Sequence, residues 1–472
     1  MLADGHGNAV YLNERECSIQ RRNQKVFEEA PSPFLDEATR SAMGQQAVAL
    51  AKAVKYRSAG TVEMLVDKHR NFYFLEMNTR LQVEHPVTEY ITGLDLVEQM
   101  IRVAAGEKLG FTQEQVQRKG WALECRVYAE DARRDFLPSI GTLKRYQEPD
   151  VSSGEVRCDS GITEGSQISI YYDPLISKLV TYGKDRNSSV ERMKEALDSY
   201  VIRGVTHNVD FLRTIMENEK FLSGDLSTAF ISQQFPDGFK GHSLTQLQRT
   251  QLLAAAAVLR ALDQQRAATI SGRSSGAVAP AHAYDREVLV SLGKASPSVK
   301  VAVESTEKAS KVTKHMAAGV ASPFNVVIDG VSHSVVAALP GSSTIYRCTI
   351  DGSDCVLQLL STDALGYTLQ FVGSPFHVQV KNATQEKLQA YMPAKKVADT
   401  SKSLVTPMPG LVANVLVKVG DTIAAGQPLA VIEAMKMQNM LSVGKTFVVK
   451  AIHVKVGESV ICHTSQIQTI NP

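Results

Sequence analysis

The chain has 472 residues, 44% of them hydrophobic, which is enough for roughly two to four domains with separate cores. Its 51 basic and 49 acidic side chains nearly cancel, so charge gives no indication of a nucleic-acid partner. The six cysteines lack the C-x-x-C spacing of a zinc site, and no apolar run reaches the about 18 residues of a membrane span. We therefore expect a multidomain globular protein with reduced thiols.

Residues 1–240 alternate between helix-like and strand-like patterns, which predicts an α+β domain. A helix is expected over about 36–55, and segments 61–67 and 72–76 are expected to form a hairpin. A hairpin-like pattern also follows Met1 directly, so we expect the chain to begin in the middle of a domain.

The middle of the chain changes from helix to strand. Ser243-Leu-Thr-Gln246 has the pattern of a capping box and predicts the start of a helix that runs to about residue 268. One face of this helix is expected to be buried, with Leu252, Ala255, Leu259 and Leu262 on it. Residues 271–283 are predicted to be a loop, and 285–390 a series of antiparallel strands.

The C-terminal part contains an internal repeat. A predicted linker at 393–403 leads to a Val- and Gly-rich segment at 404–472. Within it "VKVGDTI" (417–423) recurs as "VKVGESV" (454–460), which predicts two strand-turn units related by a pseudo-two-fold axis.

Lys436 lies near the midpoint between the two copies, at the expected tip of a projecting hairpin. A single lysine at such a place is usually an ordinary solvated turn residue. Its neighbours Met435 and Met437 are unusual in a turn, however, and indicate a surface that another protein contacts.

The predicted hairpin carries acidic side chains at matching positions. Antiparallel pairing places Glu63 opposite Glu76, so that both carboxylates lie on one face, where they suit Mg²⁺. An extended continuation would add further polar side chains to the same face, namely Asn78, Arg80, Gln82 and Glu84. The alternative is an ordinary exposed strand edge.

The segment 61–86 resembles the active site of ATP-grasp biotin carboxylases. The likeness continues through three further segments: "GWALECRVYAED" (120–131), "LPSIGTL" (137–143) and "YYDPLISKLVTYG" (171–183). It implies metal ions held by Glu63, Glu76 and Asn78, and a bicarbonate site formed by Lys25, Arg80, Gln82 and the backbone of Val83. Glu84 would be the general base for bicarbonate, and Arg126 would stabilise the enolate-like oxygen of biotin. Asn23 stands where many bacterial relatives have His, and we assign it no role.

"EAMKMQN" (433–439), with "PMPG" (407–410) upstream, resembles the biotinyl domain of biotin-dependent carboxylases. This is a flattened β-barrel, and the likeness implies biotin attached to Lys436 through an amide bond. Lipoyl carriers share this fold but usually have Asp-Lys-Ala at the tip. The family usually has Gly at the position of Phe447, so we expect a rebuilt turn there.

Nearly the whole chain resembles the α subunits of acyl-CoA carboxylases, and most closely those that act on propionyl-CoA. The expected architecture is a multidomain α+β protein. It would combine the C-terminal part of an ATP-grasp biotin carboxylase (1–240), a helix plus antiparallel β-barrel docking domain (241–392) and a flattened β-barrel biotinyl domain (404–472).

The resemblance implies a ligase that uses ATP, Mg²⁺ (or Mn²⁺) and bicarbonate to carboxylate biotin on Lys436. The carboxyl group would pass to a carboxyltransferase β subunit in an α6β6 assembly, and biotin protein ligase would be a second partner. No nucleic-acid or membrane partner is expected, and the location would be the mitochondrial matrix in a eukaryote or the cytoplasm in a bacterium.

Two alternatives stay open. The family places an N-terminal domain and a Gly-rich phosphate lid before the point where Met1 falls, so we expect this chain to accept biotin without carboxylating it unaided. A non-catalytic carrier and assembly module is therefore the main alternative, and a lipoyl carrier is the third.

Overall fold

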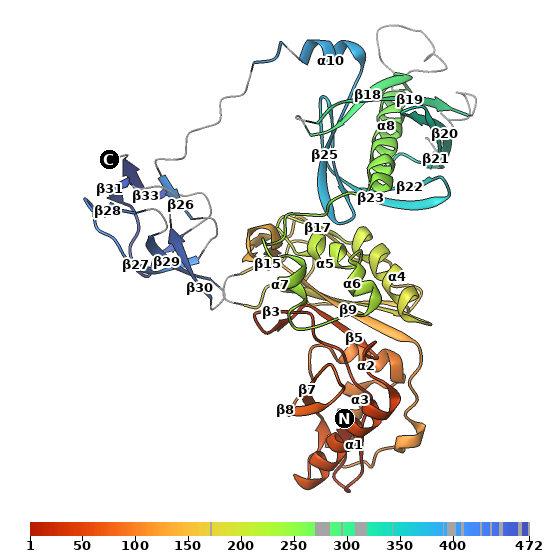
Figure 1. Ribbon diagram of the computed structural model, residues 1–472, viewed down its shortest axis with the longest axis vertical. Coiled ribbons are helices and arrows are strands. Elements are labelled where there is room, and N and C mark those ends of the chain that lie inside the picture. The colour runs from red at the N-terminus through yellow and green to blue at the C-terminus, as the bar shows by residue number, and fades with distance from the viewer. Residues whose placement is uncertain are drawn as a thin grey trace.

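The computed structural model describes residues 1–169, 172–269, 284–293, 296–306, 319–341, 343–389, 391–393, 403–406, 410–424, 427–434, 437–442, 447–460 and 465–470. An α+β part, an eight-stranded part and a small β part follow one another along the chain (Figure 1). The predicted loop at 271–283, most of the predicted linker at 393–403, and Lys436 lie outside the described residues. In the described ranges, no helix combines the length and apolar character required to cross a membrane.

The N-terminal end packs a small sheet against helices. The sheet has the order β2-β1-β6, and the elements here are β1 (Leu2–Ala3), β2 (Ala9–Val10), β6 (Ser58–Ala59), α1 (Glu37–Ala53) and α3 (Leu96–Ala104). Asp36 caps α1 by accepting a hydrogen bond from the backbone of Thr39, which confirms the predicted helix. Leu2, Val10 and Leu96 form part of the core between these elements.

A four-stranded sheet of order β14-β16-β9-β5 forms the centre of the α+β part. Its strands are β5 (Phe27–Ala30), β9 (Trp121–Tyr128), β14 (Val156–Ser160) and β16 (Leu175–Gly183). Because side chains alternate between faces, Ala122 and Val180 pack toward α2 (His85–Thr92), while Leu123 and Leu179 pack into the core that contains α4 (Arg186–Ser199).

Shorter elements surround this sheet. They are β3 (Gln20–Arg21), β4 (Gln24–Lys25), β7 (Thr61–Val66), β8 (Phe72–Asn78), β10 (Glu130–Asp131), β11 (Leu137–Pro138), β12 (Gly141–Thr142), β13 (Arg145–Gln147), β15 (Gln167–Ile168), β17 (Val201–Arg203), α5 (Val209–Ile215), α6 (Glu219–Ser223) and α7 (Phe230–Gln234). The α+β prediction for this part of the chain is confirmed.

The middle part is a closed antiparallel barrel of eight strands. They are β18 (Glu287–Leu292), β19 (Val299–Ser305), β20 (Ser322–Ile328), β21 (Val331–Ala337), β22 (Ile345–Ile350), β23 (Ser353–Asp363), β24 (Gly366–Phe371) and β25 (Ser374–Lys381), and α10 (Ala383–Gln389) follows. The barrel closes because β18 pairs with both β19 and β25. The prediction of antiparallel strands in this region is therefore confirmed.

Helix α8 (Gln246–Thr269) lies among the barrel strands (Figure 1). The predicted cap is two residues too early. Thr245 is the cap, since its hydroxyl accepts from the backbone of Gln248 at 3.2 Å and its backbone donates to the Gln248 side chain at 3.0 Å. The prediction of a single buried face is also too narrow, because nearly every side chain from Leu252 to Leu262 is buried within the surrounding barrel.

The C-terminal part has two four-stranded sheets, β26-β33-β31-β28 and β30-β29-β27-β32. Their strands are β26 (Ser403–Val405), β27 (Gly410–Val415), β28 (Thr422–Ile423), β29 (Pro428–Ala434), β30 (Met437–Ser442), β31 (Phe447–Ile452), β32 (Ser459–Val460) and β33 (Ser465–Ile470). Equivalent strands of the two repeats occupy equivalent places in the two sheets, which confirms the predicted pseudo-symmetry.

The two repeated turns are also equivalent in their hydrogen bonds. Each contains a Gly with positive φ followed by an acidic residue whose carboxylate accepts from a lysine backbone, at 2.7 Å from Lys418 to Asp421 and 3.0 Å from Lys455 to Glu458. Each turn is then bonded to a strand of the other repeat, Gly420 to Val449 and Gly457 to Val412, both at 2.9 Å.

Candidate functional site

The β7–β8 hairpin places Glu63 directly opposite Glu76, as predicted. The register shifts after Glu63, so that Met64 pairs with Phe74 instead of the expected Leu75. This irregularity follows the paired carboxylates and leaves their common face unchanged.

Asn78 connects the two carboxylates. Its side-chain nitrogen donates to Glu63 Oε1 at 3.2 Å and to Glu76 Oε1 at 3.1 Å. The three predicted metal ligands therefore converge, and carboxylate and amide oxygens are the donors that Mg²⁺ prefers. In the described part of the chain no cluster of three His, Cys, Asp or Glu side chains is placed to bind a metal. The three residues that converge here are two carboxylates and an amide.

Lys25 reaches this hairpin from β4. The β3–β4 turn contains Arg22 and Asn23, both with positive φ, a conformation that Asn adopts more easily than most residues. The Lys25 ammonium donates to Glu63 Oε1 at 2.9 Å and to Glu84 Oε1 at 2.6 Å. One cation thus joins a predicted metal ligand to the predicted general base.

Glu84 precedes helix α2 and is 2% exposed. Its side chain makes no capping bond and turns instead toward Lys25 and Arg126, whose Nη2 lies 3.0 Å from Glu84 Oε2. Burial alone would raise the pKa of Glu84, but the positive charges of Arg15 and Lys25 outweigh burial and the pKa lies below its ordinary value. Glu84 is therefore a buried carboxylate that stays ionised.

Arg126 extends from β9 between two carboxylates. Its Nε donates to Glu28 Oε1 at 2.6 Å, opposite the bond to Glu84. Glu28 is paired in the ladder with Glu124, which is fully buried and has no hydrogen-bond partner for either carboxyl oxygen. Burial raises the pKa of Glu124, and the neighbouring charge of Glu28 raises it further.

Gln82 and Arg15 complete the cluster. Gln82 donates to Glu63 Oε1 at 2.7 Å, and its own oxygen accepts from Arg15. Arg15 also donates to Thr61 and Thr88, at 3.0 and 3.1 Å. The sequence predictions missed Arg15, Glu28 and Glu124. The one available signal was a pair of acids, Glu28 and Glu29, inside an otherwise apolar strand.

The predicted extended face from Glu76 to Glu84 is wrong beyond Asn78, where β8 ends. Residues 83–84 form a turn in which the backbone of His85 donates to Gln82 at 3.2 Å. Arg80 is consequently exposed, with a bond to the Leu81 carbonyl at 3.3 Å. The Val83 carbonyl accepts from Lys178 at 3.2 Å.

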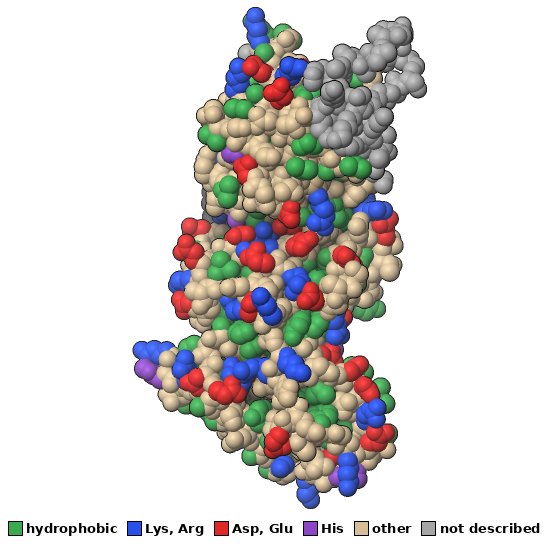
Figure 2. Space-filling view, turned by 90° about the vertical axis from the view of Figure 1, so that its right-hand side faces the viewer, with side chains coloured by type: hydrophobic (Ala, Val, Ile, Leu, Met, Phe, Trp, Pro, Cys, Tyr) green, Lys and Arg blue, Asp and Glu red, His purple; other side chains and the backbone are tan. Residues whose placement is uncertain are grey.

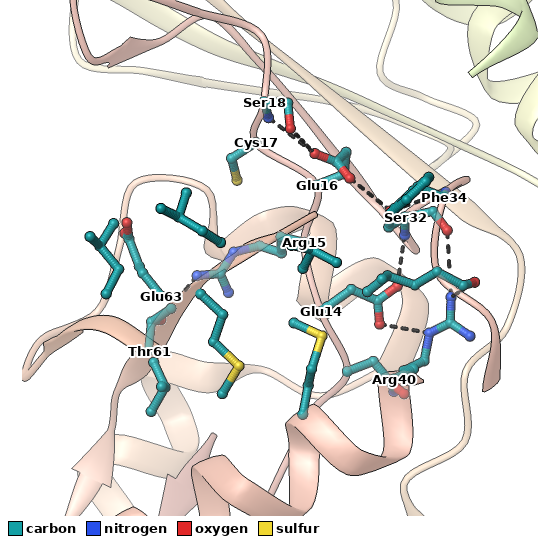
Figure 3. Close-up of a pocket in the computed structure, with 18 of the residues that line it drawn as sticks. Glu14, Arg15, Glu16, Cys17, Ser18, Ser32, Phe34, Arg40, Thr61 and Glu63 are labelled. Carbon is teal, nitrogen blue, oxygen red and sulfur yellow. Dashed lines mark hydrogen bonds and ion pairs between the residues drawn. The ribbon is translucent and has the colours of Figure 1, made fainter. Parts of the chain in front are cut away.

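A cavity of about 600 Å³ lies over this cluster and is lined by Arg15, Lys25, Glu63, Gln82 and Glu84. Figure 3 shows Arg15, Thr61 and Glu63 along one side of it and the ion pair of Glu14 with Arg40 on the other. The face seen in Figure 2 has acidic and basic side chains interspersed. The charges of Glu84 and Arg126 in the cluster are buried.

Only the base of the hairpin that carries the predicted biotin attachment site lies within the described residues. Ala434 pairs with Met437 at the end of the β29–β30 hairpin, and Met435 and Lys436 between them lie outside the described residues. Phe447 begins β31 and pairs with Ile423, whereas residues 443–446, where a rebuilt turn is expected, lie outside the described residues.

Four family models match successive parts of the chain. They are "Carbamoyl-phosphate synthase L chain, ATP binding domain" over 1–112, "Biotin carboxylase C-terminal domain" over 124–233, "Propionyl-coenzyme A carboxylase BT domain" over 252–395 and "Biotin-requiring enzyme" over 402–464.

Relatives match across nearly the whole chain. The mitochondrial propionyl-CoA carboxylase alpha chain of Mus musculus is 52% identical over 98% of this chain, which spans 62% of that protein. The propionyl-CoA carboxylase alpha chain of Ruegeria pomeroyi is 47% identical over 97% of this chain and 67% of that protein. A crystal structure of the biotin carboxylase subunit of pyruvate carboxylase is 42% identical over 51% of this chain and 53% of its own length, with a TM-score of 0.50.

Proposed function

Because this chain belongs to the family of propionyl-CoA carboxylase alpha chains, we propose that it provides the biotin carboxylase and biotin carrier functions of an acyl-CoA carboxylase, with propionyl-CoA as acceptor substrate. The chain would use ATP and bicarbonate to carboxylate biotin on Lys436. Family matches to a biotin carboxylase domain and to a biotin-requiring domain support the two functions.

The contacts and burial of Glu84 are the main support for the proposed biotin carboxylase function. A general base must be ionised and within reach of its proton donor, and Glu84 is a buried carboxylate beside the cavity with its pKa held low. Lys25 and Arg126 each contact one of its oxygens and would compensate the charge that bicarbonate brings.

The remaining site residues have proposed roles of their own. Glu63, Glu76 and Asn78 would hold Mg²⁺, which when bound neutralises the nucleotide phosphates. Lys25, Gln82, Arg80 and the backbone of Val83 would bind bicarbonate, and Arg126 would face the biotin oxygen. Since Arg80 is exposed in this structure, its part in the site requires the side chain to turn inward when substrate binds.

The proposed domains are a carboxylase part at 1–240, a docking domain at 241–392 and a flattened barrel at 404–472 behind the linker 393–403. The match to a "BT domain" supports docking of the middle domain to a carboxyltransferase β subunit, with α6β6 as the proposed assembly. Biotin protein ligase would modify Lys436. Relatives with mitochondrial names support the mitochondrial matrix in a eukaryote, and the bacterial relative supports the cytoplasm.

The alternative function is a carrier and assembly module that accepts biotin without carboxylating it. The match of residues 402–464 to "Biotin-requiring enzyme" supports the carrier part of this alternative.

Labelled bicarbonate separates the two proposals. The purified chain is biotinylated by biotin protein ligase and then incubated with ATP, Mg²⁺ and labelled bicarbonate, beside the Glu84→Gln and Lys436→Ala variants. Label on biotin that is lost in Glu84→Gln supports the catalytic proposal. Biotin on Lys436 without label transfer supports the carrier alternative, and an absence of biotin on Lys436 contradicts both.

A further inference from the structure

Two cysteines face each other inside the barrel. Cys348 on β22 and Cys355 on β23 are direct partners in the antiparallel ladder. The hairpin turns at Asp351 and Gly352, so Ile350 and Ser353 form the pair that closes the turn. In a two-residue hairpin, the two residues that close the turn form a hydrogen-bonded pair. Hydrogen-bonded and non-hydrogen-bonded pairs alternate along the ladder, so the cysteine pair, two positions further on, is also hydrogen-bonded.

The pairing brings the two cysteines close enough for a disulfide to form with a local adjustment of the strands. Partners of the hydrogen-bonded class have Cα atoms about 5.5 Å apart, within the range that disulfides occupy. Both side chains also point to the same face, because direct partners in a ladder always do. Their Cβ atoms, about 5.5 Å apart in a pair of this class, must approach to about 3.8 Å in a disulfide, so the two strands draw together locally when the bond forms.

The two thiols already interact. Each cysteine is 5% exposed and belongs to the core that the barrel forms with α8. The interaction between the two sulfur atoms lowers the pKa of Cys355 and raises that of Cys348, while the Cys355 thiol donates to the Ser353 carbonyl at 3.8 Å. Such a pair contains one thiol that ionises more readily and a neighbour that can complete the exchange.

We propose that Cys348 and Cys355 are a redox modification site, at which a cross-strand disulfide forms when the chain folds or opens in the presence of a low-molecular-weight disulfide. The Cys355 thiolate attacks the small disulfide, forms a mixed disulfide and releases one small thiol. The Cys348 sulfur then displaces the second small thiol. The two cysteines together lose two protons and two electrons, and the small disulfide is reduced to two thiols.

The position of the hairpin gives the bond a structural consequence. From β22, Arg347 donates to Ser199 at 3.1 Å. From β23, Gln358 donates to the carbonyls of Asp198 and Tyr200 at 2.8 and 3.0 Å and accepts from Arg203 at 2.6 Å. The hairpin is thus where the barrel meets the α+β part, and the disulfide would link the two strands that make this junction.

Disulfide formation is tested on the full chain at equilibrium, so that burial does not limit access. The chain is unfolded, refolded in glutathione buffers of increasing glutathione disulfide content, alkylated and cleaved at aspartate. Asp351 and Asp354 lie between the two cysteines, so cleavage there separates the cysteine-containing fragments unless a disulfide holds them together. Circular dichroism establishes that each sample has refolded.

The expected result is a linked pair of fragments that appears with glutathione disulfide, disappears on reduction and is absent from Cys348→Ser and Cys355→Ser. Cys125→Ser is the matched control, because Cys125 is fully buried, opposite Phe27 and Leu179, and the link should survive its removal. Refolded protein with both thiols free at the highest glutathione disulfide content would overturn the proposal. Stable mixed disulfides with glutathione in place of the link would overturn it too.

Discussion

Arg126 lies between Glu28 and Glu84, with Nε 2.6 Å from Glu28 Oε1 and Nη2 3.0 Å from Glu84 Oε2. All three side chains are buried, so the guanidinium compensates two carboxylates that have little access to water, and Glu84 is contacted by Lys25 at 2.6 Å as well. Among the residues that the structure describes, Arg126 is therefore the one cation that bonds to both Glu28 and Glu84.

We expect Arg126→Met to destabilise the protein by about 3–5 kcal/mol, because it leaves two buried carboxylates without their shared partner. Urea unfolding followed by circular dichroism measures the change. Arg80→Met is the matched control, since Arg80 is exposed and its replacement should stay within about 0.5 kcal/mol. Equal effects of the two substitutions would contradict the buried arrangement.

The pair of Glu28 and Glu124 predicts a pH dependence. Burial, with a smaller contribution from the charge of Glu84, raises the pKa of Glu28 to about 7 against the attraction of Arg126. Unfolded carboxyl groups titrate near the ordinary value of 4.5, so between about 4.5 and 7 the folded state binds more protons. The stabilisation that comes from the extra proton on the folded state is complete below pH about 4.5. It is lost as the pH rises through about 7.

Glu124→Gln removes one ionisable member of the pair while Lys25, Lys178 and Arg126 remain nearby. We expect its unfolding free energy to fall less than that of the unchanged protein between pH about 5 and about 8. Urea midpoints at the two pH values give the comparison, with the exposed Glu98→Gln as control. Parallel pH profiles for Glu124→Gln and the unchanged protein would show that the pair does not hold an additional proton.

In a protein that transfers label from bicarbonate to biotin, Glu84→Gln should reduce the transfer rate by about 100-fold or more, as removal of a general base does. Nucleotide affinity should change little, because Glu84 contacts Lys25 and Arg126 rather than Glu76 or Asn78. Initial rates and nucleotide titrations provide the two readouts. A normal rate would mean that another group accepts the proton.

Lys436→Ala should abolish recognition of the biotinylated chain by streptavidin. Lys418→Ala and Lys455→Ala are matched controls, because these lysines lie on the exposed repeated turns of the same part of the chain. Both control variants should keep the full signal. Residual signal in Lys436→Ala would place biotin on another lysine.

The corrected start of α8 gives a separate test of the fold. Thr245→Ala should cost about 1 kcal/mol, because the Thr245 hydroxyl caps the helix. Ser243→Ala should stay within about 0.5 kcal/mol. Thermal or urea unfolding distinguishes the two variants. A larger loss of stability in Ser243→Ala would support the capping box at Ser243 that the sequence pattern predicts.

Local patterns explain what the sequence could predict. The pairing of Glu63 with Glu76 was predictable because both strands of the hairpin are adjacent in the chain and their register follows from alternation. The repeated turns were predictable for a similar reason, since "VKVGDTI" and "VKVGESV" contain their own glycines and acids. In both cases the structure depends on residues that are close in sequence.

Contacts between residues far apart in the chain explain what could not be predicted from the sequence. Glu28 meets Glu124 and Arg126 only because β5 lies beside β9, and no local pattern fixes that neighbour. The end of β8 at Asn78 was missed for a different reason: polar alternation continues to Glu84, although the chain turns before α2. The burial of α8 on all sides likewise depends on strands that follow it in the chain.

The reciprocal bonds of Gly420 to Val449 and of Gly457 to Val412 have a consequence for folding. Each turn finds its hydrogen-bond acceptor in the other repeat, so neither repeat can complete its structure alone. Contacts between such distant residues form late and together, which makes partial unfolding of one repeat costly. We therefore expect amide hydrogens of both turns to exchange with solvent at a common rate, as members of one cooperative unit.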